Sequence, residues 1–175
     1  MNICAIDQSL TSTGVTIFDI STEEILYMGL IKTTPRDKFS GVENSEEERI
    51  FSIRKDLIKL IDKYDCKFAF MEGLSFNNRN SISARILAGI YYTMLTTFMD
   101  RFLSYQTFPP TTVKAFAVKG NASKEEMFEA LPEEVKNRIN EMNAKKTTGM
   151  FDLTDSYFIG KLAIKLIKEE KIQLS

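Results

Sequence analysis

Two predicted strands, the first and the fourth along the chain, end in an acidic residue that could do chemistry. The segment NICAID ends in Asp7, and the segment KFAFME ends in Glu72. An ionised carboxylate beside a buried strand costs free energy unless a hydrogen-bond donor or a cation compensates its charge. A lone aspartate at such a place is more often a turn residue, so the meaning of Asp7 depends on which groups the fold brings near it.

A second pair of acids lies on the last predicted helix, from about residue 150 to 171. At about 100° per residue, Asp152 and Asp155 project onto the apolar side of this helix. That side consists of Phe151, Phe158, Ile159, Leu162, Ala163, Leu166 and Ile167. A helix dipole stabilises an acid in the first turn by only about 0.3–1 kcal/mol, so two acids on the buried side call for a stronger counter-charge.

The elements that position these acids begin with three predicted strands in an antiparallel meander. They are Asn2 to Asp7, Gly14 to Asp19 and Ile25 to Lys32. An amphipathic helix at about 50–64 then leads to the strand 67–72. A right-handed crossover through this helix makes strand 67–72 parallel to strand 2–7. If the two strands are neighbours, Asp7 and Glu72 lie side by side at the carboxyl edge of the sheet, where ligands bind in such folds.

The rest of the chain alternates helices with one more strand. The predicted elements are a helix at about 81–101, a strand at 104–108, and helices at 111–118, 123–131, 133–142 and about 150–171. Together they predict an α/β fold with a mixed five-stranded sheet flanked by helices. With 175 residues, of which 43% are hydrophobic, residues 1–175 are expected to form a single domain with one core.

Composition excludes several classes of enzyme. The chain has no histidine, which excludes Ser-His-Asp catalysis and His-ligated zinc hydrolases, and it has no GxxxxGK[ST] phosphate loop. Cys4 and Cys66 are predicted to be buried thiols in a reducing cytoplasm. No signal peptide is predicted, because the N-terminus carries Asp7 and lacks a basic region. Any chemistry must therefore come from carboxylates and lysines.

Four carboxylates that meet without a cation repel one another and raise one another's pKa. Mg²⁺ resolves this conflict, because it takes oxygen ligands and keeps several of its waters. Two such ions about 3.5–4 Å apart can activate a water and stabilise a leaving oxygen in phosphodiester hydrolysis. The hypothesis from the residues alone is thus a two-metal phosphodiesterase, with Mg²⁺ replaceable by Mn²⁺.

Five segments along the chain carry a family resemblance: NICAIDQSLTSTGVTIF, FAFMEGLSF, PTTVK, KGNASK and FDLTD. In order and spacing they resemble the RuvC-type Holliday junction resolvases of the RNase H-like superfamily, in particular its divergent, shorter phage-encoded members. The resemblance covers residues 2 to about 165. It implies a Mg²⁺-dependent, structure-selective endodeoxyribonuclease that cleaves Holliday junctions or related branched DNA, such as flaps or forks.

The resemblance also implies six site residues, namely four metal-binding acids and two lysines that contact the scissile phosphate or offset its charge. These are Asp7, Glu72, Asp152, Asp155, Lys114 and Lys124. The family usually places a base-stacking aromatic three residues after its second acid, and here Phe76 is the nearest candidate. The loop before Lys124 reads GNAS, where the family often has a second glycine, so a preferred cleavage sequence is not carried over.

DNA binding requires a local basic surface, because the net charge is −1 and the pI is about 5.7. Residues 73–124 contain six Lys or Arg residues and one acid, as expected for contacts with phosphates. Arg79, Arg85 and Lys119 in this segment are predicted to bind DNA. Lys145 and Lys146 in the linker before the last helix are predicted to extend the same surface.

The segment RILAGIYYTMLTTFM is apolar on nearly every side, which predicts burial on both sides of its helix. A core helix or a two-fold dimer interface explains this pattern, and the resemblance implies a homodimer.

Two rival functions remain open. AIDQSLTSTGVTIFD also resembles the phosphate loop of sugar kinases of the actin-like superfamily, which predicts ATP binding. A non-catalytic DNA-binding relative is the other rival, although such a protein is expected to lose at least one acid.

Overall fold

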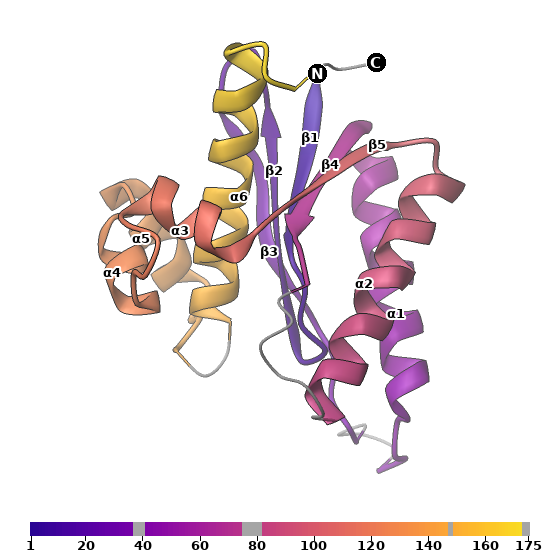
Figure 1. Ribbon diagram of the computed structural model, residues 1–175. Helices are drawn as coiled ribbons and strands as arrows, with labels where there is room; N and C mark the ends of the chain where they lie inside the picture. Colours follow the sequence, from indigo (N-terminus) through magenta and orange to yellow (C-terminus); the bar gives the residue numbers. More distant parts are fainter. Residues whose placement is uncertain (37–40, 75–81, 147–148, 173–175) are drawn as a thin grey trace.

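The computed structural model describes residues 1–36, 41–74, 82–146 and 149–172. A five-stranded sheet in the order β3-β2-β1-β4-β5 runs through its centre (Figure 1). The strands are β1 (Asn2–Asp7), β2 (Ser12–Asp19), β3 (Ile25–Lys32), β4 (Cys66–Glu72) and β5 (Ser104–Phe108). The first three are antiparallel to one another, whereas β4 is parallel to β1 and β5 is parallel to β4. The predicted mixed sheet is therefore confirmed.

Two helices, α1 (Glu46–Lys63) and α2 (Ile82–Asp100), cover one face of the sheet (Figure 1). α1 begins earlier than predicted because Ser45 and Glu48 form a capping box, which satisfies two backbone N–H groups at its start. Its buried residues Ile53, Leu57 and Ile61 recur at helical spacing. α1 also provides the crossover that lays β4 beside β1.

The other face is covered by α6 (Met150–Lys168), as Figure 1 shows. Three short helices pack beyond it: α3 (Pro110–Ala117), α4 (Lys124–Glu129) and α5 (Glu133–Glu141). α6 is buried along most of its length. It ends at Lys168, earlier than predicted, because Glu170 adopts a left-handed conformation and the Lys171 N–H donates to Leu166 O instead.

The strand pairing places several chain segments at one edge of the sheet. Ile6 of β1 pairs with Met71 of β4, so that the two strands end side by side. In the antiparallel pair β1–β2, Asp7 stands opposite Gly14. The Gly73 N–H then donates to Phe108 O at 2.8 Å, which joins the ends of β4 and β5. This edge contains the chain segments on which the sequence predicts the acids.

Only one side of α2 is buried within the isolated chain, so the core-helix explanation of its apolar pattern does not hold. Ile90, Met94 and Phe98 are buried against the sheet layer, whereas Tyr92 and Met99 are 61% and 56% exposed. Apolar residues on two sides of a helix do not specify whether the second side packs within one chain or against another molecule. Among the described residues, no helix combines the length and the apolar character that crossing a membrane requires.

Candidate active site

Asp7 is an acid in an apolar environment at the end of β1. Its side chain is buried, with 8% of the residue exposed, and this burial raises the pKa of its carboxyl well above the ordinary value. Repulsion from Asp155, Glu72 and Asp152 raises this pKa further, and the Lys124 ammonium opposes the effect. Asp7 is thus the centre of a group of acids from three different elements.

The pKa values of the other three acids are raised as well. Burial raises the pKa of Glu72 to about 7, with a further contribution from Asp155, while Lys124 and Lys114 act in the opposite direction. The pKa values of Asp152 and Asp155 are also raised, in both cases mainly by burial and against the effect of Lys124. Desolvation and mutual repulsion therefore outweigh the two lysines.

Lys124 forms an ion pair with one of these acids. Its Nζ lies 3.3 Å from Asp155 Oδ2 and 5.8 Å from the centre of the Phe151 ring. Burial acts to lower the pKa of Lys124, but attraction to Asp155 and Asp7 is stronger and raises it overall. The side chain is still 49% exposed. Lys124 is therefore a charged group at the mouth of the site, where it can reach both the acids and a ligand from solvent.

Sequence reasoning missed two polar residues next to the acids. Gln8 is buried, and its Nε2 donates to Glu72 O at 2.8 Å, which ties the turn after β1 to the end of β4. Ser12 is also buried and lies close enough to Asp152 to lower its pKa. Gln8 Oε1 and Ser12 Oγ make no hydrogen bond of normal geometry within the described structure. The available signal was the run of polar residues that continues directly after Asp7.

The donor set fits a hard divalent cation. The acids supply only carboxylate oxygens, and their raised pKa values follow first from burial and then from repulsion between the acids. Within the described ranges, however, no group of three or more His, Cys, Asp or Glu side chains is already arranged to hold a metal ion. The acids share one electrostatic environment without forming a closed cage. Mg²⁺, which keeps several of its waters, does not require such a cage.

Other predicted site residues lie farther from the acids. Lys114 is half-buried on α3 and lowers the pKa values of Glu72 and Asp155, so it faces the same edge. Lys119 pairs with Glu126 at 2.5 Å, and Lys146 pairs with Glu125 at 3.3 Å.

The remaining predicted DNA-binding residues lie on or near other elements. Arg85 is exposed on α2 and pairs with Glu46 at 2.7 Å. Lys145 is exposed in the segment before α6. Phe76 and Arg79 lie outside the described residues. The structure thus leaves the basic surface spread over several elements.

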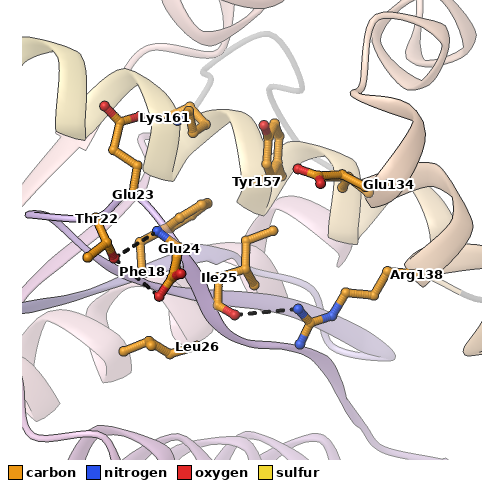
Figure 2. A pocket seen from close by; sticks show the side chains of 11 residues that line it. Phe18, Thr22, Glu23, Glu24, Ile25, Leu26, Glu134, Arg138, Tyr157 and Lys161 are labelled. Carbon is orange, nitrogen blue, oxygen red and sulfur yellow. Dashed lines mark hydrogen bonds and ion pairs between the residues drawn. The ribbon is translucent and has the colours of Figure 1, made fainter.

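A pocket of about 570 Å³ lies at the opposite end of the sheet (Figure 2). It is formed by the turn between β2 and β3, by α5 and by the middle of α6. Glu23, Lys161 and Arg138 contribute charged groups to its wall, and the Arg138 Nη1 donates to Ile25 O at 3.4 Å. None of the four acids lines it. The cavity and the carboxylate group are therefore separate features of the molecule.

Known proteins with similar sequences are crossover junction endodeoxyribonucleases. The chain is 29% identical to RuvC of Prochlorococcus marinus strain MIT 9312 over 135 residues, which cover 75% of this chain and 80% of that protein. RuvC of strain MIT 9301 is 27% identical over a region of the same length. No protein-family model matches the sequence.

Solved structures show the same fold at low sequence identity. Thermus thermophilus RuvC, in complex with a Holliday junction substrate, superimposes with a TM-score of 0.70 at 15% identity, covering 97% of this chain and 96% of that one. The yeast mitochondrial Holliday junction resolvase superimposes with a TM-score of 0.64 at 13% identity, covering 97% and 80%. Sequence and fold together confirm the resemblance that the motifs predict.

Proposed function

We propose that this chain, a RuvC-type relative with the RNase H-like fold, is a divalent-cation-dependent endodeoxyribonuclease that cleaves Holliday junctions or related branched DNA. One observation carries the proposal: four acids from β1, β4 and α6 repel one another beside Lys124. The similarity to RuvC relatives supports the reaction, and resolvase structures with Holliday junction DNA support branched DNA as the substrate.

In this proposal Asp7, Glu72, Asp152 and Asp155 hold two Mg²⁺ ions, for which Mn²⁺ can substitute. Once bound, the ions supply activation of the attacking water and stabilisation of the leaving oxygen. Glu72, whose pKa is about 7, keeps a proton for part of the time at neutral pH in the cation-free protein and must lose it to act as a ligand. Gln8 keeps the end of β4 beside the end of β1.

The two lysines act on the phosphate in different ways. Lys124 stays protonated, because the acids raise its pKa, and its exposed ammonium can donate to a non-bridging oxygen of the scissile phosphate. Lys114 lies near Glu72 and Asp155 and offsets part of the charge that builds up in the transition state. Neither lysine needs to give up a proton.

Residues around the site are proposed to position the DNA through its phosphates. The candidates are Phe76, Arg79, Arg85, Lys119, Lys145 and Lys146. Three of them pair with exposed acids. Exposed ion pairs of this kind contribute only about 0–1 kcal/mol, so a phosphate can replace the acid at little cost.

The exposed side of α2 is proposed to pair with its counterpart in a second copy. Gly89, Tyr92, Thr96 and Met99 are exposed at the spacing of a single helical stripe. A two-fold axis places the same stripe of both copies in contact. Such a dimer presents two active sites, which matches the two opposed strands that a four-way junction offers for cleavage.

Sedimentation velocity tests the dimer. Tyr92→Glu is expected to reduce the protein from dimer to monomer at micromolar concentration, because it places two charges at the two-fold contact. Leu26→Glu changes an exposed apolar residue on the edge strand β3, away from α2. It is the matched control and leaves the dimer intact. A monomeric wild-type protein would contradict the proposal.

A gel assay with matched four-way junction, flap and linear duplex DNA tests the nuclease. Cleavage of branched substrates with Mg²⁺, and none with EDTA, is the expected result. Asp7→Asn is expected to lower the cleavage rate by at least roughly 10³-fold, since it removes a ligand of ions that supply several kcal/mol, while junction binding survives.

The matched control is Asp19→Asn, because Asp19 also ends a strand, at the opposite edge of the sheet, and pairs there with the N-terminus. This variant should cleave like the wild type. Junction binding without cleavage by the wild type would favour a non-catalytic relative. Undiminished cleavage by Asp7→Asn would refute the proposed site.

A further inference from the structure

The backbone of α6 lies directly against β2 at Gly14. A Cβ atom at Gly14 would lie 2.1 Å from the backbone oxygen of Asp152 and 3.1 Å from the backbone nitrogen of Leu153. Both distances involve main-chain atoms, which cannot rotate away as a side chain can. Gly14 is not among the residues with positive φ, so the glycine is required here for space and not for its backbone conformation.

Two further contacts continue along the same pair of elements. Thr16 Oγ1 and Ser156 Oγ lie 2.8 Å apart in a hydrogen bond between two fully buried hydroxyls. Beyond them, a Cβ atom at Gly160 would lie 2.3 Å from Cε2 of the Phe18 ring. Each contact brings one residue of β2 against one residue of α6.

The three contacts share one regular spacing. On β2 the residues are two apart, at positions 14, 16 and 18, and on α6 they are four apart, at positions 152, 156 and 160. Two strand residues advance by about 6.6 Å, and four helical residues advance by about 6.0 Å. The two repeats nearly coincide, so α6 runs along β2 in a single register over three successive contacts.

This register bears directly on the acids. Gly14 stands opposite Asp7 in the β1–β2 pairing, so the backbone contact with α6 occurs at the strand position beside Asp7. A shift of α6 by one residue would move its side chains by about 1.5 Å along the axis and about 100° around it. Asp152 and Asp155 would then no longer face Asp7.

We propose that Gly14, Thr16 and Ser156 are positioning residues. The close packing at Gly14 and the Thr16–Ser156 hydrogen bond set the register of α6, and this register places Asp152 and Asp155 opposite Asp7 for cation binding. The inference rests on the proposed function. It assigns no contact with substrate to Gly14, Thr16 or Ser156, since all three act through the acids.

Gly14→Ala and Gly160→Ala form a matched pair for the test. Both add one methyl group to the same interface. The first meets the backbone of Asp152, whereas the second meets the Phe18 ring and the Ala5 Cβ about two helical turns farther along α6. Mn²⁺ affinity by calorimetry and the rise in Tm on adding Mn²⁺ are the readouts. Gly14→Ala is expected to weaken Mn²⁺ binding by about 10- to 100-fold, whereas Gly160→Ala lowers Tm in EDTA but keeps its Mn²⁺ affinity. Wild-type affinity in Gly14→Ala, or equal losses in both variants, would overturn the proposal.

Thr16→Val and Ser156→Ala decide the question if Gly14→Ala does not fold. Each removes the same hydrogen bond, so each is expected to weaken Mn²⁺ binding several-fold, and the double variant is expected to lose no more than either single one. Unchanged affinity in both would overturn the proposal. Asp7→Asn is measured alongside. If this variant binds Mn²⁺ like the wild type, the proposed cation site itself fails. If it loses Mn²⁺ affinity while Gly14→Ala keeps it, only the register inference fails.

Discussion

The two ends of α6 differ in how the acids around them are compensated. At its C-terminal half, Lys161 and Lys168 both bind the Glu23 carboxylate, and these hydrogen bonds lower the pKa of Glu23 to about 2. At its N-terminal end, burial and neighbouring acids raise the pKa of Glu72 to about 7, although Lys124 and Lys114 oppose the shift. One helix thus joins an acid that has two lysine partners to a group of acids that two lysines do not compensate.

The difference separates structural charges from functional ones. Glu23 has its partners within the chain and contributes to holding the β2–β3 turn against α6 (Figure 2). The acids around Asp7 remain destabilised in the folded protein, so a cation from outside the chain gains binding energy there. A carboxylate group that lowers the stability of its own fold is more informative about function than a pocket, and here the pocket lies at the compensated end.

The largest difference between the two ends is expected in catalysis. Lys124→Ala should lower the cleavage rate by about 10²–10³-fold, the loss typical for a donor that stabilises charge in the transition state. Junction affinity should fall much less, because Lys124 is one of several basic groups around the site. Single-turnover cleavage and binding by gel shift in Ca²⁺ separate the two effects.

Lys161→Ala is the matched control, because this lysine also pairs with an acid but lies at the other end of the same helix. It should lower Tm and leave the cleavage rate unchanged. Equal loss of binding and cleavage in Lys124→Ala would reduce this lysine to a DNA anchor, and the comparison between the two ends would no longer concern catalysis.

Much of the sheet could be predicted from the sequence. Apolar runs bounded by polar turns marked every strand, and the chirality of the crossover predicted that β4 lies parallel beside β1, as observed. The acids at positions 7 and 72 stood out because strand ends are local features. Such patterns work where a residue's role depends on its neighbours in sequence.

Contacts between distant segments were not predictable in the same way. Glu23 and Lys161 are far apart in sequence and meet only through the tertiary fold. Gly14 was predicted only as the first residue of a strand, because nothing local indicates that the Asp152 carbonyl lies against it. The sequence left two explanations open for the outer side of α2 for a related reason: hydrophobicity indicates that a surface is covered but not by which molecule.

A smaller difference between the two ends is expected in stability, and its sign reverses from one end to the other. The pKa of Glu72 is raised in the folded state, so its contribution to stability is fully present below about pH 4.5 and is lost as the pH rises through about 7. In EDTA the free energy of unfolding should therefore decline over this range, by about 3 kcal/mol for a shift of this size. Glu72→Gln should remove that part of the decline, and saturating Mg²⁺ should oppose it in the wild type.

Glu23→Gln provides the opposite case. The pKa of Glu23 is lowered, so its contribution is present above about pH 4.5 and is lost as the pH falls through about 2. The side chain is 35% exposed, and screening by solvent limits the expected loss at pH 7 to about 1 kcal/mol. Urea unfolding in EDTA at pH 4.5, 6 and 8 measures both variants: at pH 8 Glu72→Gln should be more stable than the wild type and Glu23→Gln less stable. If both substitutions destabilise the protein at pH 8, cationic partners within the chain offset the charge of Glu72 as they do that of Glu23. The pKa of Glu72 then no longer distinguishes the cation site from the ion pair at the other end of α6.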